Sequence, residues 1–266
     1  MLRRTKYMLL LSVPLLMLMA GTSGKSLLGA QRGGQRLPDL VRRGPKTEKV
    51  IALTFDDGPD PRFTPRILAI LKERHVRATF FMVGRNAEKY PSLVKLIDEN
   101  GDVIGNHTYS HPDLRVESQD QMRLEITRCE DILQSITGKR ATLFRPPKGF
   151  YDRRALQMLS GLDLQPILWA LTVEHKACAT PEDMAQRVMQ KIEPGEILLA
   201  HDGRLNREKT VEAMPLIIDG LKSRGYRFVT VPEMLELLRE SSDTPARRAF
   251  RFIDGNVIVA ALKRVL

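Results

Sequence analysis

The chain has 266 residues, of which 42% are hydrophobic and 28% are charged. These proportions are ordinary for a globular protein, and the length suits one large α/β domain or two small ones. The formal net charge is +10, and residues 1–20 carry +3, residues 25–46 carry +5 and residues 245–266 carry +4. This leaves −2 for residues 47–244. The nearly neutral body argues against a nucleic-acid groove, so we expect no nucleic-acid partner.

The basic flanks favour contact with an anionic envelope polymer or a lipid surface. Solvated tails without any partner explain the same charge equally well.

The N-terminus has the pattern of a secretory signal. Three basic residues, Arg3, Arg4 and Lys6, precede an apolar run over residues 7–20. This run is shorter than the roughly 20 residues that span a bilayer. No clean cleavage motif follows, so residues 1–24 are interpreted as a signal peptide or an uncleaved signal anchor. We therefore expect an exported protein that is secreted, periplasmic or anchored on the outer face of the membrane.

Composition also indicates the boundaries of the linker, the domain and the C-terminal extension. Residues 25–46 are rich in Gly, Arg and Gln and are interpreted as a basic linker. Residues 47–244 alternate between short apolar runs and helical patterns and form the expected domain. Residues 245–266 are assigned to a basic C-terminal extension, in which an Asp-Gly pair predicts a small hairpin.

Strands and helices alternate through the expected domain. Strands are predicted at 49–55, 78–83, 102–106, 142–145, 165–171, 196–201 and 226–231. Helices are predicted near 64–74, 86–100, 118–137, 152–160, 181–193, 207–224 and 232–240. Seven consecutive strand–helix units predict a parallel sheet with helices outside it. The expected fold is an α/β protein with an incomplete or distorted (β/α) barrel of about seven strands; a doubly wound open sheet is the alternative.

Two adjacent acids end the first predicted strand. Asp56 and Asp57 follow the apolar run 50–53 and precede Gly58-Pro59, which breaks the strand. Carboxylates that leave a buried strand must be paired, hydrogen-bonded or bound to a metal. An ordinary Asp-Gly turn is the alternative interpretation of this stretch.

Other reactive residue types also follow predicted strands. Along the chain they are His107, Arg145, Thr172–His175 and His201-Asp202. Active sites of (β/α) barrels lie at the carboxyl ends of the strands, so these residues are expected to meet at one face.

His107 and His111 are four residues apart, a spacing that places both imidazoles on one side of a helical turn. With Asp57 they form a set of two histidines and one carboxylate that leaves positions open for water and substrate. Zinc hydrolases and non-haem iron oxygenases both use such sets, so the ligands alone do not determine the reaction.

Four stretches together resemble motifs of the polysaccharide deacetylases, the NodB-homology family. In the family's order they are Thr54–Gly58, His107–His111, Arg145–Gly149 and Leu199–His201. The resemblance implies that Asp57, His107 and His111 hold a divalent metal ion, usually Zn²⁺, with Co²⁺ as another possibility.

The same resemblance implies the catalytic roles. Asp56 would be the general base, Arg145 would hold and orient that base, and His201 would be the general acid. Leu199 would line the pocket for the acetyl methyl group. Trp169 and Pro147 are further expected substrate contacts.

The fourth motif departs from the family pattern. The family reads Trp-Ser-Val-Asp-x-x-Asp-Trp, of which this chain keeps Trp169 but has Thr172 and His175 in place of the acids. The acid that orients the arginine and tunes the catalytic histidine is therefore missing. Glu174 or His175 are the two candidates to replace it.

We therefore expect an exported, metal-dependent hydrolase that removes N-acetyl groups from a polysaccharide containing N-acetylhexosamine. Peptidoglycan, chitin-like oligomers and exopolysaccharides are the candidate substrates. An O-acetyl esterase acting on a glycan is one alternative. A non-catalytic, metal-containing glycan-binding barrel is another, and it predicts that Asp56→Asn leaves function intact. An iron oxygenase is less favoured, because it would give Asp56, Arg145 and His201 no purpose. The sequence does not indicate an oligomeric state.

Overall fold

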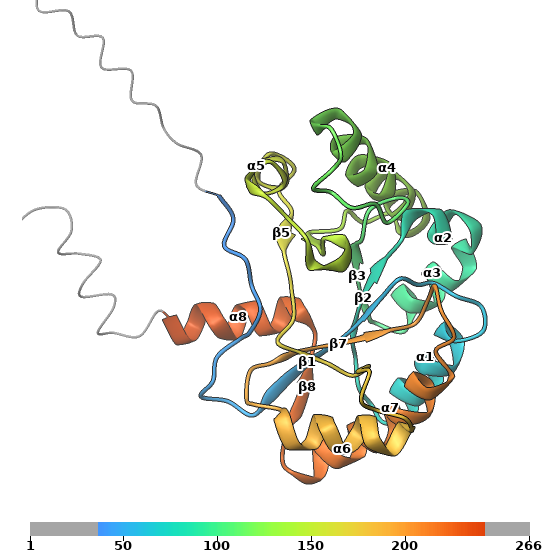
Figure 1. The fold of residues 1–266 in the computed structure, drawn as a ribbon, viewed down its shortest axis with the longest axis vertical. Coiled ribbons are helices and arrows are strands. Elements are labelled where there is room, and N and C mark those ends of the chain that lie inside the picture. Colours follow the sequence, from blue (N-terminus) through green and yellow to red (C-terminus); the bar gives the residue numbers. More distant parts are fainter. Residues whose placement is uncertain (1–36, 243–266) are drawn as a thin grey trace, which may run out of the picture. The chain divides into compact units, whose positions relative to one another are not determined.

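The computed structural model describes residues 37–242 (Figure 1). The strands are β1 (Val50–Asp56), β2 (Thr79–Met82), β3 (Val103–Asn106), β4 (Leu143–Phe144), β5 (Gln165–Pro166), β6 (Leu171–Thr172), β7 (Ile197–His201) and β8 (Arg227–Val229). The helices are α1 (Thr64–Glu73), α2 (Gly84–Lys89), α3 (Pro91–Glu99), α4 (Gln119–Thr137), α5 (Arg153–Gly161), α6 (Pro181–Lys191), α7 (Glu208–Ser223) and α8 (Val231–Ser242), with a 3₁₀ turn η1 (Pro147–Gly149). The predicted signal segment, most of the predicted linker and the C-terminal extension with its hairpin lie outside the described residues.

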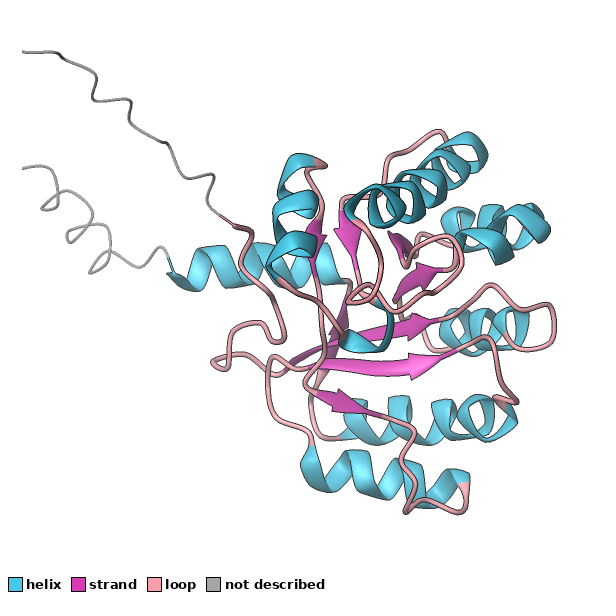
Figure 2. Cartoon of the chain, turned by 45° about the horizontal axis from the view of Figure 1, so that its top comes forward, coloured by secondary structure: helices cyan, strands magenta, loops and turns pink. Residues whose placement is uncertain are grey.

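The sheet curls into an incomplete barrel. Every strand pair is parallel, and the hydrogen-bonded order is β5-β4-β3-β2-β1-β7-β6, with β8 beside β1. The first and last strands of this order, β5 and β6, belong to one short stretch of chain, so the two ends of the sheet come together. Helices surround the strands on the outside (Figure 2). The predicted incomplete (β/α) barrel is confirmed.

The central strand β1 positions the first acids. All seven of its residues are buried, and it pairs with β2, β7 and β8. On one side of its core, the rings of Phe55 and Phe80 stack with centroids 5.0 Å apart. The register with β7 places Asp56 opposite His201. Strand pairing alone therefore brings together the two residues for which acid and base roles were expected.

Helix boundaries follow local signals. α4 ends at Gly138, whose φ of 72° is the left-handed conformation that glycine adopts without strain. α6 begins at Pro181 behind a capping box in which Thr180 and Asp183 satisfy each other's backbone N–H groups. The predicted helix 86–100 is instead two helices, α2 and α3. Pro91 opens the second, because it lacks the N–H that a continuous helix would need.

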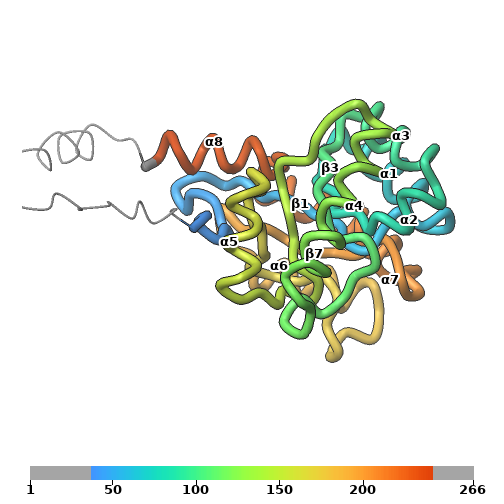
Figure 3. The backbone as a smooth tube through the Cα atoms, turned by 90° about the horizontal axis from the view of Figure 1, so that it is seen from above, coloured from blue at the N-terminus to red at the C-terminus, as the bar shows by residue number. Residues whose placement is uncertain are grey.

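Part of the predicted linker belongs to the barrel. Val41 bridges in parallel to Ile167, and the Gly44 N–H donates to Gly195 O at 2.7 Å. Gly44 also lies against Met234 of α8, and Figure 3 shows this first described segment running beside α8. These backbone pairings attach residues 41–44 to the barrel, although they precede the predicted start of the domain at residue 47. Within residues 37–242, no helix combines the length and the apolar character that crossing a bilayer demands.

Candidate active site

The turn after β1 aims Asp57 into the site. Asp57 has a φ of 74°, and Asn86 donates from its side-chain amide to Asp57 O at 2.8 Å. Gly58 follows because a Cβ there would collide with the carboxylate of Asp202. That carboxylate accepts a hydrogen bond from Thr64 Oγ1 at 2.5 Å. The Asp-Gly pair is therefore a turn whose shape is dictated by a buried neighbour.

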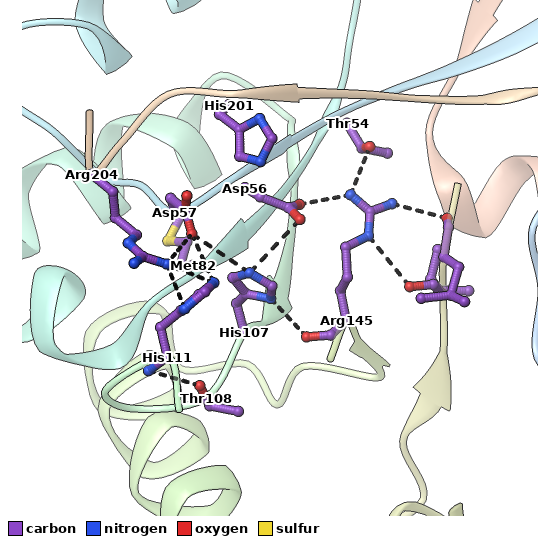
Figure 4. A network of polar contacts seen from close by, with 12 residues as sticks. Thr54, Asp56, Asp57, Met82, His107, Thr108, His111, Arg145, His201 and Arg204 are labelled. Carbon is purple, nitrogen blue, oxygen red and sulfur yellow. Dashed lines mark hydrogen bonds and ion pairs between the residues drawn. The ribbon is translucent and has the colours of Figure 1, made fainter. Parts of the chain in front are cut away.

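Asp57, His107 and His111 form a group that could hold a metal ion. Their potential ligand atoms all lie within 4.8 Å of one another. Asp57 Oδ1 is 3.2 Å from His111 Nε2 and 3.7 Å from His107 Nε2 (Figure 4). The same Asp57 oxygen is buried and has no hydrogen-bond partner. A buried carboxylate oxygen without a donor is a costly arrangement that a cation would satisfy, so the residues fit a metal.

Both histidines are in a form that can bind a metal ion. His107 Nδ1 lies 2.7 Å from the carbonyl oxygen of Arg145, so it donates its proton there and leaves Nε2 with a free lone pair. Burial is the main cause that lowers the pKa of both imidazoles, to about 4. Both rings are therefore neutral near pH 7, which is the form that binds metals.

Asp56 is held by a fully buried arginine. Arg145 Nη1 donates to Asp56 Oδ1 at 2.6 Å and to Thr54 Oγ1 at 2.8 Å. The guanidinium also donates to the carbonyl oxygens of Ile167 and Leu168. Burial raises the pKa of Asp56, and the charge and hydrogen bond of Arg145 oppose that rise. The result is a carboxylate with a fixed orientation and more basicity than a solvent-exposed one.

Of the two candidates for the missing acid, Glu174 is the one that contacts His201. His201 Nδ1 lies 3.1 Å from Glu174 Oε2, and the His201 backbone N–H donates to Glu174 Oε1 at 3.0 Å. Thr210 donates to the same Oε1 at 2.9 Å. Burial lowers the pKa of His201, but the hydrogen bond and charge of Glu174 outweigh burial, so the net pKa is raised. Glu174 can therefore supply the negative charge beside His201, whereas the Arg145 guanidinium is held by Asp56, Thr54 and two backbone carbonyls.

The other altered positions face elsewhere. His175 is exposed, and its Nδ1 accepts a hydrogen bond from the Ala177 N–H at 3.1 Å. Thr172 donates to Glu174 O at 3.0 Å, and its own carbonyl accepts from Arg187. These bonds hold the loop that presents Glu174 to the site.

The three expected substrate contacts lie near the site with different exposure. Leu199 is 2% exposed and lies in β7, two residues before His201. Trp169 is partly buried, and its ring is 5.7 Å from the guanidinium carbon of Arg145. Pro147 is buried in the turn η1. Their roles toward a glycan stay predictions.

Two arginines that the sequence analysis did not single out also border the metal group. Arg204 Nη1 lies 3.1 Å from His111 Nε2 and 3.9 Å from Asp57 Oδ1 (Figure 4). Arg207 Nη2 lies 3.6 Å from the other oxygen of Asp57. Both follow the His201-Asp202 pair closely in the sequence, and this proximity to a strand end was the one signal that could have indicated them.

Comparison with known proteins agrees with this geometry. The family model described as polysaccharide deacetylase matches residues 43–167. A peptidoglycan-N-acetylglucosamine deacetylase of Bacillus cereus is 40% identical over 201 residues, which cover 74% of this chain and 72% of that protein. The chain belongs to the polysaccharide deacetylase family. The predicted resemblance and the predicted hydrolase class are thereby confirmed.

Solved structures place the barrel among the same deacetylases. A crystal structure of a peptidoglycan N-acetylglucosamine deacetylase matches with a TM-score of 0.72 and 38% identity, and the match covers 74% of this chain and 92% of that one. A protein from Bacillus anthracis described as a CE4 family pseudoenzyme matches with a TM-score of 0.70 and 30% identity, covering 74% of this chain and 69% of that one. This polysaccharide deacetylase therefore resembles both a deacetylase and a protein described as a pseudoenzyme. Whether it is catalytically active has to be inferred from the residues of its own site.

Proposed function

We propose that this polysaccharide deacetylase is an exported, metal-dependent hydrolase that removes acetyl groups from N-acetylhexosamine units, with peptidoglycan as its substrate. One observation carries the proposal. The buried Asp56–Arg145 pair and the His201–Glu174 pair both lie at the group formed by Asp57 and the two histidines. The peptidoglycan deacetylases among the relatives support the choice of substrate over chitin-like oligomers and exopolysaccharides.

The metal group supports a zinc-dependent hydrolase. Asp57, His107 and His111 would hold the ion, and three nitrogen and carboxylate ligands with open positions are typical of catalytic zinc. When bound there, a divalent ion polarises a carbonyl group and lowers the pKa of water towards neutrality. We propose Zn²⁺ as the ion, with Co²⁺ as an alternative.

Asp56 is proposed as the general base. Its carboxylate takes one proton from the water whose oxygen attacks the acetyl carbonyl carbon, so that a carbon–oxygen bond forms. Arg145 fixes the carboxylate through the 2.6 Å hydrogen bond and is itself held by two backbone carbonyls. The base therefore does not have to reorient when the reaction begins.

His201 is proposed as the general acid. Since its Nδ1 is engaged by Glu174, Nε2 is the atom that offers a proton. The carbon–nitrogen bond breaks, the electron pair stays on the sugar nitrogen, and that nitrogen takes the proton from His201 Nε2. The products are acetate and a free amine on the sugar. The intact His201–Glu174 pair is also the reason to favour turnover over a purely glycan-binding role.

Export is proposed from the sequence alone. Residues 1–24 have a basic start and a 14-residue apolar run, and this pattern is typical of a secretory signal. A substrate outside the cytoplasm requires such a segment. Contact of the basic flanks with an anionic envelope polymer or a lipid surface is part of the same proposal.

Acetate release from matched substrates tests the function. The purified chain, loaded with zinc in one sample and cobalt in another, is incubated with peptidoglycan, chitin oligomers and acetylated xylan. Acetate from an N-acetylated glycan and none from xylan is the expected result. Acetate from xylan alone would indicate that the protein is an O-acetyl esterase and not an amidase. No acetate from any substrate, with metal bound, would favour the glycan-binding alternative.

A further inference from the structure

A cavity adjoins the metal group and is strongly cationic. It has a volume of about 360 Å³. Its lining includes Arg85, Lys89, Arg204, Tyr90, Asp60 and His111. His111 belongs to both the cavity and the metal group, so whatever fills the cavity lies beside the reacting centre.

The acidic side chain that lines the cavity does not neutralise its positive charge. Asp60 is its one acidic lining residue, and it is already bound by Arg62, which donates to its two oxygens at 3.1 and 2.9 Å. Arg85 and Lys89 make no ion pair within residues 37–242, and both are exposed. Arg204 reaches from the cavity to His111. Three cations therefore face a cavity that is suited to an anion.

The position of the cavity limits what the anion can be. Because His111 lines the cavity and belongs to the metal group, the part of a glycan next to an acetamido group bound there would extend towards the cavity. The lining is mostly polar and charged, and Lys89 Nζ lies over the Tyr90 ring, 5.1 Å from its centroid. An anionic group attached to the glycan reaches the cavity together with the reacting sugar, at no additional cost of association.

We propose that Arg85, Lys89 and Arg204 form a specificity site for a carboxylate carried by the glycan next to the acetamido group that reacts. This inference rests on the proposed deacetylase function and names its substrate class: acidic rather than neutral N-acetylated glycans. The carboxylate belongs either to an ether substituent of a sugar ring or to a peptide attached to it.

The test compares three substrates, two of which differ mainly in the charge of the carboxylate. They are a peptide-free peptidoglycan tetrasaccharide with free lactyl carboxylates, the same tetrasaccharide with its carboxylates converted to methyl amides, and a tetrasaccharide with its peptides retained. We expect kcat/KM for acetate release to be about five- to tenfold higher for the free acid than for the amide, since two or three exposed charge contacts act together. A preference seen only with peptides retained would assign the carboxylate to the peptide.

The double variant Arg85→Ala/Lys89→Ala removes two of the three cations. Its acid-to-amide ratio of kcat/KM should fall to near one, and the same loss should follow for the native protein at about 1 M salt, where the Debye length is about 3 Å. The matched control is Lys72→Ala/Lys191→Ala. It makes the same charge change at the C-terminal ends of α1 and α6, at the opposite end of the barrel. The control should keep the preference.

A binding measurement separates this inference from the function itself. Calorimetric titration of the Asp56→Asn protein with the three tetrasaccharides measures affinity without turnover. Tighter binding of the acid, lost with Arg85→Ala/Lys89→Ala, supports the specificity site. Equal affinity and equal kcat/KM for all three tetrasaccharides would overturn it while leaving the deacetylase function in place. Absence of acetate from all three substrates would instead overturn the function.

Discussion

Glu174→Gln tests whether Glu174 has taken over the tuning of His201. The substitution keeps the size of the side chain, replaces one of its two acceptor oxygens with an NH2 group, and removes a negative charge 3.1 Å from His201 Nδ1. An opposite charge at such a distance shifts a pKa by about 1–3 units. Because the side chains are 24% and 20% exposed, solvent screens the pair, and we expect the low end, about one unit or about 1.4 kcal/mol.

The direction of the effect follows from the role of His201. A general acid works only while it is protonated, so its pKa sets the high-pH limb of the profile of kcat/KM against pH. Glu174 raises that pKa, and its neutralisation lowers it. The high-pH limb of Glu174→Gln should therefore move to lower pH by about one unit. Glu174→Asp keeps the negative charge, so its high-pH limb should lie between those of Glu174→Gln and the native protein.

The assay is acetate release from peptidoglycan across the pH range, with the His201 imidazole titrated by NMR in the same proteins. A lowered imidazole pKa and a shifted limb in Glu174→Gln are the expected pair of results. The reasoning is refuted if His201 titrates at the same pH in Glu174→Gln and in the native protein.

Three further substitutions test the supports of the site. Asp57→Ala should abolish stoichiometric zinc binding after dialysis, measured by mass spectrometry; one ion retained per chain would remove Asp57 from the metal group. Thr54→Val deprives the buried Arg145 guanidinium of a 2.8 Å acceptor and should lower the free energy of unfolding by about 1–3 kcal/mol, so an unchanged urea midpoint would speak against this hydrogen bond. Gly58→Ala places a Cβ against the carboxylate of Asp202 and should destabilise the fold by about 1–3 kcal/mol; an unchanged Tm would show that the turn has room.

Much of the site could be predicted because strand ends are readable from sequence. Apolar runs located β1 and β7, and a parallel register necessarily brings their carboxyl ends to one face. Asp56 and His201 were expected to lie at that face for this reason. The spacing of His107 and His111 indicated the other two members of the metal group, which the structure gathers within 4.8 Å. The predicted helical turn was wrong, because residues 107–111 form a loop in which Thr108 and His111 have positive φ.

Glu174 could not be chosen over His175 from sequence, because both lie in an irregular loop. Which side chain faces the site depends on long-range bonds to that loop, such as the one from Arg187 to the Thr172 carbonyl. His175 is turned away by a local bond to the Ala177 N–H. Neither bond has a periodic signal in the chain.

The predicted strand 165–171 shows a second limit. The structure divides it into β5 and β6, which pair with strands at opposite ends of the sheet. Between them, the carbonyls of Ile167 and Leu168 accept hydrogen bonds from Arg145. The backbone of this stretch therefore accepts hydrogen bonds from a buried arginine instead of continuing as one strand. The apolar character of the residues does not indicate these hydrogen bonds.

Asp56 is proposed to act as the general base beside a metal ion that other residues hold. The most direct measurement is acetate release from peptidoglycan by the zinc-loaded native protein and by Asp56→Asn, with zinc per chain determined in both. Removal of a general base costs about 10²- to 10⁴-fold in rate, so Asp56→Asn should keep its zinc and lose at least a hundredfold in activity. Undiminished acetate release by Asp56→Asn, or none by the native protein with zinc bound, would contradict the account.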